Sequence, residues 1–379
     1  MIRRIATATA TMVLLLLVTI GALPASAAAA EASAPRFQVD PFWPKPLPND
    51  WLMGQAAGVA VDAQDHVWVI QRPGTLTEDE RGAALDPPRS KCCRPAPPVL
   101  EFDQEGNLVQ GWGGPPQAGS GSAGYEWFDN EHGITIDHKG FVWLGGNGPN
   151  DGQILKFTRD GKFVLRIGGK GPQTNSADTT RLGRPADTFI DAEANEVYVA
   201  DGYYNHRVIV FDADSGAFKR QWGAYGKPPT DDKLAPYDQK ARQFGNPVHC
   251  VKIARDGLVY VCDRSNNRIQ VFRKDGSFVK EFPLVGETRG AGGVWYLDIW
   301  PDRKQTFLMN ADGENNEVRT LLRESGEVLG AFGRSGRNAG EFHWVHNLAI
   351  DSHGNVFTTE VDTGKRAQKF KYLGGEIER

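Results

Sequence analysis

The chain repeats one unit of about 40 residues six times, and this self-similarity constrains its fold more than any other feature. The third copy spans residues 184–223 and the fourth spans residues 246–282. Each copy contains four short runs of alternating apolar and polar residues, separated by Asp/Gly turns, and such alternation is typical of strands with one buried face. Four strands form a sheet too small to bury its faces alone, whereas six sheets packed radially can do so. The sequence therefore predicts an all-β fold, a six-bladed β-propeller.

The remaining copies define the limits of the predicted propeller, residues 54–379. The second runs from Glu131 to Gly169, the fifth from Gly293 to Gly333, the sixth from Val345 to about Gly375, and the first begins at Gly58 and is interrupted by residues 73–98. The sixth copy ends after its third strand. We expect its outer strand to come from "RFQVD" (36–40), within an N-terminal segment at 28–53, so that the two ends of the propeller close the ring.

The N-terminus has the pattern of an export signal. Arg3 and Arg4 form a basic region, residues 12–23 an apolar region, and "ASA" at 25–27 a small-residue cleavage motif. We expect residues 1–27 to be a signal peptide and the protein to be secreted or periplasmic, with no membrane association after cleavage. An uncleaved anchor and a twin-arginine route are the alternatives, although the apolar stretch is short for a spanning helix.

Charge and cysteine content exclude some classes of function. Lys+Arg 43 against Asp+Glu 47, with no long basic run, argues against a nucleic-acid partner. Cys250 and Cys262 flank a turn on two strands expected to be antiparallel, and they form either a disulfide or two buried thiols. A bridge between the adjacent Cys92 and Cys93 would be an uncommon arrangement. No CxxC metal motif is present, so no function is built on the cysteines.

Histidines recur at one position of the repeat, at the start of the first strand. In repeat order this position holds Ala57, His132, Ala186, His249, Trp295 and His346. Alternate blades of a six-bladed ring lie about 120° apart, and the first strand borders the central channel, so three imidazoles would converge there. Three protein ligands with an open position suit a catalytic zinc ion. The alternative is that each is an ordinary loop residue; His66, His138, His343 and His353 are expected on the surface.

Residues at the end of the second strand should face the same side of the ring as these histidines. This position holds Arg72, Asn147, Gly202, Arg264, Ala311 and Val361 in the six copies. The repeat does not require the two arginines, and Tyr203 follows directly after Gly202. We expect Arg72, Arg264 and Tyr203 around the metal. Inserts at 73–98 and 224–243 emerge on this side and either wall a pocket or are disordered.

Two resemblances follow from these motifs. Tyr198–Phe211 and Tyr260–Phe272 show the "YVAD…N.RI.VF" pattern and resemble NHL repeats. Together with "VADGYYNHRV" (199–208) and the three histidine motifs, the chain resembles the peptidyl-α-hydroxyglycine α-amidating lyase family. Members of that family are six-bladed propellers that release glyoxylate and an amide from a peptide ending in α-hydroxyglycine, using zinc.

The resemblance implies roles for six residues. The zinc ligands of the family fall on His132, His249 and His346, its catalytic tyrosine on Tyr203, and its site arginines on Arg264 and Arg72. It implies that Tyr203 is the base, with Arg264 and zinc favouring the phenolate. It also implies that Arg72 holds the substrate carboxylate as a bidentate fork, so the expected partner is a small-molecule or peptide substrate with a carboxylate.

The sequence also departs from that family. The family binds a structural calcium through an aspartate after its last histidine, and Asn347 stands there; a neutral amide is a weaker calcium ligand, which argues against calcium. Tyr204 and Val271 replace its disulfide cysteines. Two other functions stay open: a metal-dependent propeller hydrolase or lyase acting on another small carboxylated substrate, and a non-catalytic exported NHL scaffold.

Overall fold

The computed structural model describes residues 33–116, 124–233, 235, 237–375 and 377. Residues from Ala34 onward form one compact unit. The expected signal peptide at 1–27 lies outside the described residues. Within the described part of the chain, no helix combines the length and apolar character that crossing a bilayer requires.

Six four-stranded antiparallel sheets form the fold, as the repeat predicted. From the inner strand outward, the first sheet consists of β3 (Gln55–Val61), β4 (Val67–Arg72), β6 (Val99–Phe102) and β7 (Leu108–Trp112). The second consists of β8 (Glu131–Ile136), β9 (Val142–Gly146), β10 (Gln153–Phe157) and β11 (Phe163–Gly168). The third consists of β12 (Asp187–Asp191), β13 (Glu196–Asp201), β14 (Arg207–Asp212) and β15 (Phe218–Trp222). The fourth sheet consists of β16 (Val248–Ile253), β17 (Val259–Asp263), β18 (Arg268–Phe272) and β19 (Phe278–Pro283). The fifth consists of β20 (Tyr296–Ile299), β21 (Phe307–Asp312), β22 (Glu317–Leu322) and β23 (Val328–Phe332). The sixth consists of β24 (Val345–Ile350), β25 (Val356–Glu360), β26 (Arg366–Tyr372) and β1 (Phe37–Asp40).

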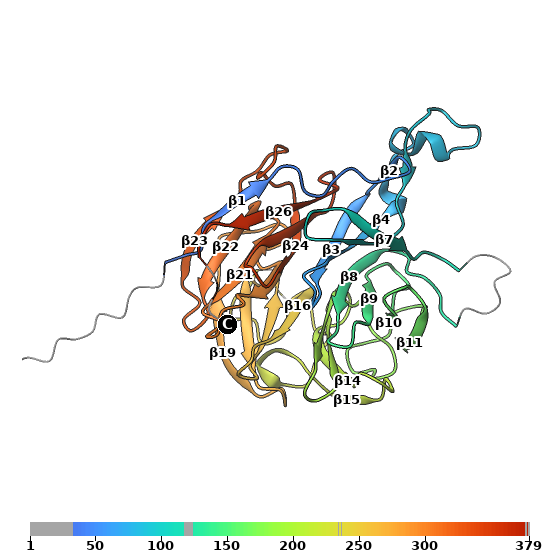
Figure 1. Ribbon diagram of the computed structural model, residues 1–379. Helices are drawn as coiled ribbons and strands as arrows, with labels where there is room; N and C mark the ends of the chain where they lie inside the picture. Colours follow the sequence, from blue (N-terminus) through green and yellow to red (C-terminus); the bar gives the residue numbers. More distant parts are fainter. Residues whose placement is uncertain (1–32, 117–123, 234, 236, 376, 378–379) are drawn as a thin grey trace, which may run out of the picture. The chain divides into compact units, whose positions relative to one another are not determined.

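The inner strands close the ring. Each contacts the inner strand of the next sheet in the order β3, β8, β12, β16, β20, β24 and back to β3. The sixth sheet joins the two ends of the propeller, because β1 pairs antiparallel with β26 (Figure 1). Phe37 of β1 also packs against Trp300, Phe332 and Tyr372.

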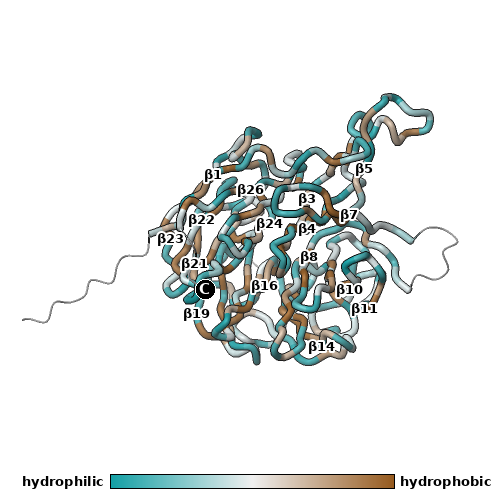
Figure 2. Tube along the Cα trace, viewed as in Figure 1, coloured by the Kyte–Doolittle hydropathy of each residue, from teal (hydrophilic) through white to brown (hydrophobic). Residues whose placement is uncertain are grey.

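The core lies between neighbouring sheets. Brown, apolar stretches occur within the strands, for example around β10, β14 and β16 (Figure 2). Trp68, Trp143 and Trp295 are among the largest fully buried side chains. Burying one such side chain contributes about 1.5–3 kcal/mol. Since these side chains are buried between sheets, the contacts of the sheets with each other supply much of their stability.

Buried arginines tie each repeat together internally. Arg207 Nε donates to Asp201 Oδ2 at 2.8 Å, and Arg268 Nε donates to Asp263 Oδ2 at 2.7 Å, with all four side chains fully buried. These are the arginines of the repeat pattern, and their role is structural. Breaking such a buried pair by removing one partner typically costs about 3–5 kcal/mol.

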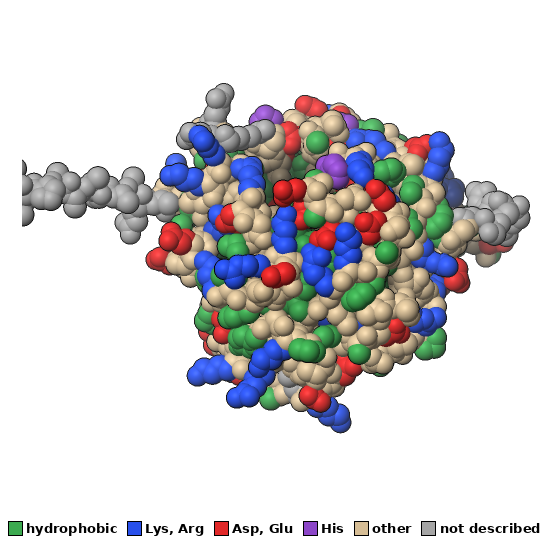
Figure 3. Space-filling model, turned by 90° about the horizontal axis from the view of Figure 1, so that it is seen from below, with side chains coloured by type: hydrophobic (Ala, Val, Ile, Leu, Met, Phe, Trp, Pro, Cys, Tyr) green, Lys and Arg blue, Asp and Glu red, His purple; other side chains and the backbone are tan. Residues whose placement is uncertain are grey.

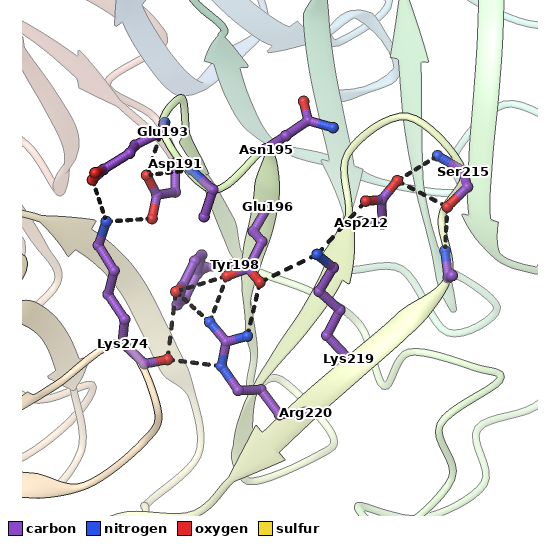
Figure 4. A network of polar contacts seen from close by, with 12 residues as sticks. Asp191, Glu193, Asn195, Glu196, Tyr198, Asp212, Ser215, Lys219, Arg220 and Lys274 are labelled. Carbon is purple, nitrogen blue, oxygen red and sulfur yellow. Dashed lines mark hydrogen bonds and ion pairs between the residues drawn. The ribbon is translucent and has the colours of Figure 1, made fainter.

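The turn between the third and fourth strands of a sheet reaches back to the preceding sheet. Lys274, in the turn after β18, pairs with Asp191 at 2.6 Å, and its backbone carbonyl accepts from Arg220 Nε at 2.7 Å (Figure 4). Arg220 also binds Glu196 and Tyr198 of its own sheet. These networks hold adjacent sheets in register around the ring.

The insert at 73–98 contains two short 3-10 helices, η1 (Pro73–Thr75) and η2 (Asp79–Ala84), and β5 (Arg94–Pro95), which pairs with β2 (Trp51–Leu52). Its tip projects away from the sheets (Figure 1). Lys365 anchors its base by donating to Thr75 O at 2.9 Å and Glu80 Oε2 at 2.6 Å. The insert is therefore packed against the sixth blade as well as the first.

Both cysteine pairs are disulfides. Cys250 and Cys262 lie opposite each other on β16 and β17, as expected, and are bridged. The adjacent Cys92 and Cys93 in the insert are bridged as well, which is an uncommon arrangement. The described residues of the second insert pack onto blades four and five: it contains η3 (Ala224–Gly226), and Tyr237 donates to Gly290 O at 3.0 Å.

Candidate metal centre and catalytic site

The three predicted histidines meet in the channel. His132, His249 and His346 are each 1–2% exposed, and one nitrogen from each lies within 4.8 Å of the others. Their ring centroids are 5.1, 4.7 and 5.0 Å apart, with interplanar angles of 88°, 76° and 85°. Three nearly perpendicular imidazoles therefore face one point from three sides.

A β-bulge places each histidine. The pairing of inner and second strands shifts between Glu131 and Ile134, between Val248 and Cys250, and between Val345 and Asn347, so the histidine falls within the shift each time. A bulge adds an unpaired residue and redirects its side chain. Alternation along a regular strand would not by itself produce this orientation.

The blades without a histidine at this position each supply a backbone carbonyl that orients the histidine of the preceding blade. His132 Nδ1 bonds to Ala186 O at 2.8 Å, His346 Nδ1 bonds to Ala57 O at 2.6 Å, and His249 Nδ1 bonds to Trp295 O. Each carbonyl belongs to the residue that occupies the histidine position in the next blade. Since a carbonyl only accepts, Nδ1 carries the proton and the Nε2 lone pair is left for a ligand. Histidine-bearing blades therefore alternate with blades that supply the carbonyl.

Burial keeps these imidazoles neutral. Removal from water is the largest cause lowering the pKa of all three rings well below the ordinary value, and the cations Arg72 and Arg264 lower it further. Neutral imidazole is the form that binds a metal ion. The three rings are therefore in a form that could hold a metal ion.

Tyr203 lies against two histidines of this cluster. Its hydroxyl is 3.0 Å from His132 Nε2 and 2.9 Å from His249 Nε2, and it accepts from Arg264 Nη1 at 3.3 Å. Gly202 makes this approach sterically allowed, since a Cβ there would lie 2.1 Å from the backbone N and O of Val248. Tyr203 is therefore held where a proton can pass between the phenol and a ligand beside the histidines.

The two predicted arginines lie on either side of the cluster. Arg264 donates through Nε to Ala291 O at 2.7 Å, and its guanidinium lies 3.5 Å from the centroid of the Trp295 ring. Arg72 donates through Nε to Glu131 O at 2.7 Å and through Nη1 to Gln55 Oε1 at 2.7 Å. Within the described residues neither forms an ion pair, although they are only 7% and 8% exposed. Buried cations without a carboxylate partner favour an anionic ligand.

Sequence reasoning missed two side chains near the site. Arg184, in the loop before β12, lies with its guanidinium 6.0 Å from the centroid of the Tyr203 ring. Trp344 is 37% exposed and packs edge-on against Trp295 at 5.3 Å. Neither occupies a position compared across the repeats, so periodicity gave no signal for either.

The donor set fits zinc better than calcium. Three imidazole nitrogens with an open side are the ligands of a catalytic zinc, whereas calcium requires oxygens. Asn347 Oδ1 is buried and has no hydrogen-bond partner in the structure, but it is a single neutral oxygen. Asp187 and Lys252 already form an ion pair in the channel, at 3.6 Å. One neutral oxygen is far from the oxygen-rich ligand set that calcium requires, so Asn347 gives a calcium site little support.

A second group of potential ligands, Asp62, His66 and Glu101, lies away from the channel. Arg159 occupies it, pairing with Asp62 at 2.8 Å and with Glu101. His66 Nδ1 lies 2.6 Å from Glu101 Oε1, and the network between blades one and two leaves the His66 side chain half-buried. A guanidinium already satisfies these carboxylates, which leaves no room for a metal.

The other three histidines that were expected on the surface lie toward the outside. His138 and His353 are exposed, and His343 is half-buried with Nε2 2.9 Å from Asp362 Oδ2. On the face seen from below, basic and acidic side chains are interspersed (Figure 3).

Comparison with known proteins agrees with the fold and with the family. The NHL repeat model matches residues 182–211 and 248–272. The chain is 25% identical to a probable peptidyl-alpha-hydroxyglycine alpha-amidating lyase of Caenorhabditis elegans, over 83% of this chain and 81% of that protein. It is 24% identical to the peptidyl-glycine alpha-amidating monooxygenase of Mus musculus, over 82% of this chain and 30% of that protein.

Two further proteins are similar to this chain, one in sequence and one in fold. NHL repeat-containing protein 3 of Mus musculus is 26% identical over 89% of this chain and 84% of that protein. A solved streptogramin B lyase has a TM-score of 0.51 at 12% identity, covering 89% of this chain and 98% of that chain, which supports the fold alone. The chain spans less than a third of the monooxygenases that it matches, 26% and 30% in two of them.

The protein is a six-bladed NHL-repeat β-propeller with a three-histidine cluster in its channel. Its relatives support the resemblance to the peptidyl-α-hydroxyglycine α-amidating lyase family at low identity.

Proposed function

We propose that this protein is a zinc-dependent lyase that cleaves an N-acyl-α-hydroxyglycine to an amide and glyoxylate. The observation that carries this proposal is the position of the Tyr203 hydroxyl, within 3.0 Å of two histidine Nε2 atoms and within reach of Arg264. A scaffold that only binds a partner has no need of a phenol inside a cluster of neutral imidazoles.

His132, His249 and His346 would hold the zinc ion through Nε2. When bound, zinc supplies a Lewis acid that makes the hydroxyl of the substrate more acidic. Tyr203, held as a phenolate by the Arg264 guanidinium, takes the proton from that hydroxyl and becomes a neutral phenol. Arg72 binds the substrate carboxylate, because its guanidinium is buried and has no carboxylate partner among the described residues.

The reaction balances without a further reactant. The C–N bond breaks and its electron pair goes to the nitrogen, the carbinol oxygen becomes the aldehyde oxygen of glyoxylate, and the hydroxyl proton ends on the amide nitrogen. Tyr203 can carry that proton in both directions, since it accepts it from the hydroxyl and returns it to the leaving amide. No oxidant or water is consumed.

A metal-dependent hydrolase of similar fold is the second candidate. The same histidines would serve it, but propeller hydrolases of the lactonase kind use carboxylate-rich calcium sites, and no carboxylate belongs to this cluster. We also propose that the protein acts after export, on a substrate outside the cytoplasm; the basic and apolar N-terminal pattern supports this.

The test is product analysis with N-acetyl-α-hydroxyglycine. Zinc-loaded protein should yield acetamide and glyoxylate in equal amounts, faster than the enzyme-free blank. A γ-lactone carrying a carboxylate serves as the substrate of the competing function. Lactone opening without glyoxylate would replace the lyase proposal with the hydrolase.

A further inference from the structure

Arg184 is a third arginine beside Tyr203, and it comes from a different part of the fold than the other two. It lies in the loop between blades two and three, where its Nε donates to Asn147 O at 2.6 Å. That bond directs the guanidinium toward Tyr203, whose ring centroid is 6.0 Å away. Arg264 approaches the hydroxyl of the same tyrosine from blade four.

No carboxylate pairs with Arg184 in the described part of the chain. The nearby carboxylate of Asp151 is already engaged, since it accepts from the backbone N–H groups of Asp129, Asn130 and Gly148. Arg207 lies in the same blade and has Asp201 as its partner. Arg184 therefore has a free charge on the side of the site that faces Tyr203.

The backbone at Arg184 is held in an uncommon conformation. Its φ is +59°, a region that residues other than glycine, asparagine and aspartate rarely adopt. Two backbone bonds enforce it, from Arg184 N to Asp151 O at 3.0 Å and from Tyr203 N to Arg184 O at 3.2 Å. Such strain tends to persist where a side chain must be placed for function.

The proposed reaction leaves Arg184 without a role. The substrate carboxylate is assigned to Arg72 and the phenol to Arg264, and an N-acyl-α-hydroxyglycine with a neutral acyl group offers no further negative charge. A half-buried cation beside the reacting groups is best satisfied by a second anionic group of the ligand.

We propose that Arg184 binds a second negative charge, carried by the acyl half of the substrate, so that the preferred substrate is an N-acyl-α-hydroxyglycine with an anionic acyl group. A peptide with an acidic residue near its C-terminus and the monoamide of a dicarboxylic acid both belong to this class. The inference rests on the proposed lyase function and adds a specificity to it.

A pair of nearly isosteric substrates tests this specificity. N-succinyl-α-hydroxyglycine carries a terminal carboxylate, and N-succinamoyl-α-hydroxyglycine carries a neutral amide in its place. Wild-type protein should favour the succinyl substrate in kcat/KM by about tenfold, the value of one charge-assisted hydrogen bond, with the difference mainly in KM. Arg184→Gln should bring the ratio close to one, and Arg184→Lys should restore part of it.

Arg181→Gln is the matched control. Arg181 lies three residues away in the same loop, and its guanidinium is bound to the backbone carbonyls of Pro172 and Lys170. This variant should keep the wild-type ratio. Equal kcat/KM for the two substrates in wild-type protein, or an Arg184→Gln variant that keeps the preference, would overturn the assignment.

A binding measurement separates this inference from the lyase proposal. N-succinylglycine and N-succinamoylglycine lack the hydroxyl group and cannot react, so calorimetric titration of zinc-loaded protein reports recognition alone. If neither hydroxyglycine releases glyoxylate, the lyase proposal fails. In that case a succinyl preference that Arg184→Gln abolishes would still support the subsite, and equal affinities would reject it.

Discussion

Tyr203 is the residue on which the proposed chemistry depends. Its hydroxyl approaches His132 and His249 to within 3.0 Å, and Arg264 donates to it. Both Nε2 atoms are acceptors in the tautomer fixed by the carbonyls behind them, so the phenol donates to one imidazole at a time. Binding of a metal by the histidines would displace this bond and free the oxygen to act on a substrate.

Replacing Tyr203 with phenylalanine tests this role. We expect kcat for glyoxylate release to fall by at least about a hundredfold, because general base catalysis typically contributes that much. The zinc content, measured by atomic absorption, should stay the same, because the histidines alone hold the metal. Unchanged turnover would refute the assignment of Tyr203 as the base.

The histidines make stability depend on pH. Burial holds the pKa of His346 in the folded protein well below the ordinary value of 6.5. At a pH between the folded pKa and 6.5, the unfolded chain therefore binds a proton that the folded protein does not. The free energy of unfolding therefore rises with pH through this window and falls as the pH drops below 6.5.

This dependence is measurable in metal-free protein by urea unfolding between pH 7 and pH 5. His346→Gln should make the slope shallower by up to about 1.4 kcal/mol per pH unit, because one proton is removed from the linkage. Identical slopes in the two proteins would show that His346 is not held neutral.

The residues that sequence reasoning found share one property, a position that can be compared across repeats. His132 stood out because only alternate copies carry histidine at its position, and Arg72 because only one other copy carries arginine at its own. Tyr203 stood out because it directly follows the position compared with Arg72. The carbonyl of Ala186 could not be found in this way, because any residue supplies one. Arg184 lies in a connecting loop, where copies differ in length, and its approach to Tyr203 depends on the backbone conformation.

Among the structural elements, the bulged inner strands of blades two, four and six position the three histidines. Periodicity indicated the strand, but a bulge leaves no clear mark in an alternating run, so the orientation of the histidine required the structure. Close approach of β8 to the next blade requires Gly133, since a Cβ there would lie 2.6 Å from Ala186 O, the acceptor of His132.

Gly133→Ala should therefore weaken the metal site. The added methyl group displaces Ala186 or β8 and disturbs the bond that orients His132, and loss of such a supporting bond lowers metal affinity by about tenfold to a hundredfold. Competition with a zinc chelator measures the affinity. Gly169→Ala is the control, because no atom lies within 4 Å of a Cβ there, and zinc affinity equal to that of the control would contradict the prediction.

At the scale of the whole molecule, closing the ring keeps the three histidines together. They come from blades two, four and six, so their spacing depends on all six interfaces between blades. The sixth blade takes β1 from the N-terminal side of the chain. The sequence predicted this strand because the sixth copy ends after its third strand, whereas the repeat gives each blade four.

Deleting β1 should loosen this closure. A variant that begins after residue 40 loses the pairing with β26 and the packing of Phe37, and we expect its melting temperature to fall by several degrees, since each kcal/mol lost typically lowers it by about 2–4 °C. A variant that begins at residue 34 keeps β1 and is the control. Equal melting temperatures would show that β1 does not stabilise the ring.

The rate of glyoxylate release from N-acetyl-α-hydroxyglycine, measured as zinc is returned to metal-free protein, tests the proposed function most sharply. We expect no release above the blank without metal, a linear rise up to one zinc per chain, and no further increase beyond that. Full occupancy of the site by one zinc ion with no release of glyoxylate would contradict it.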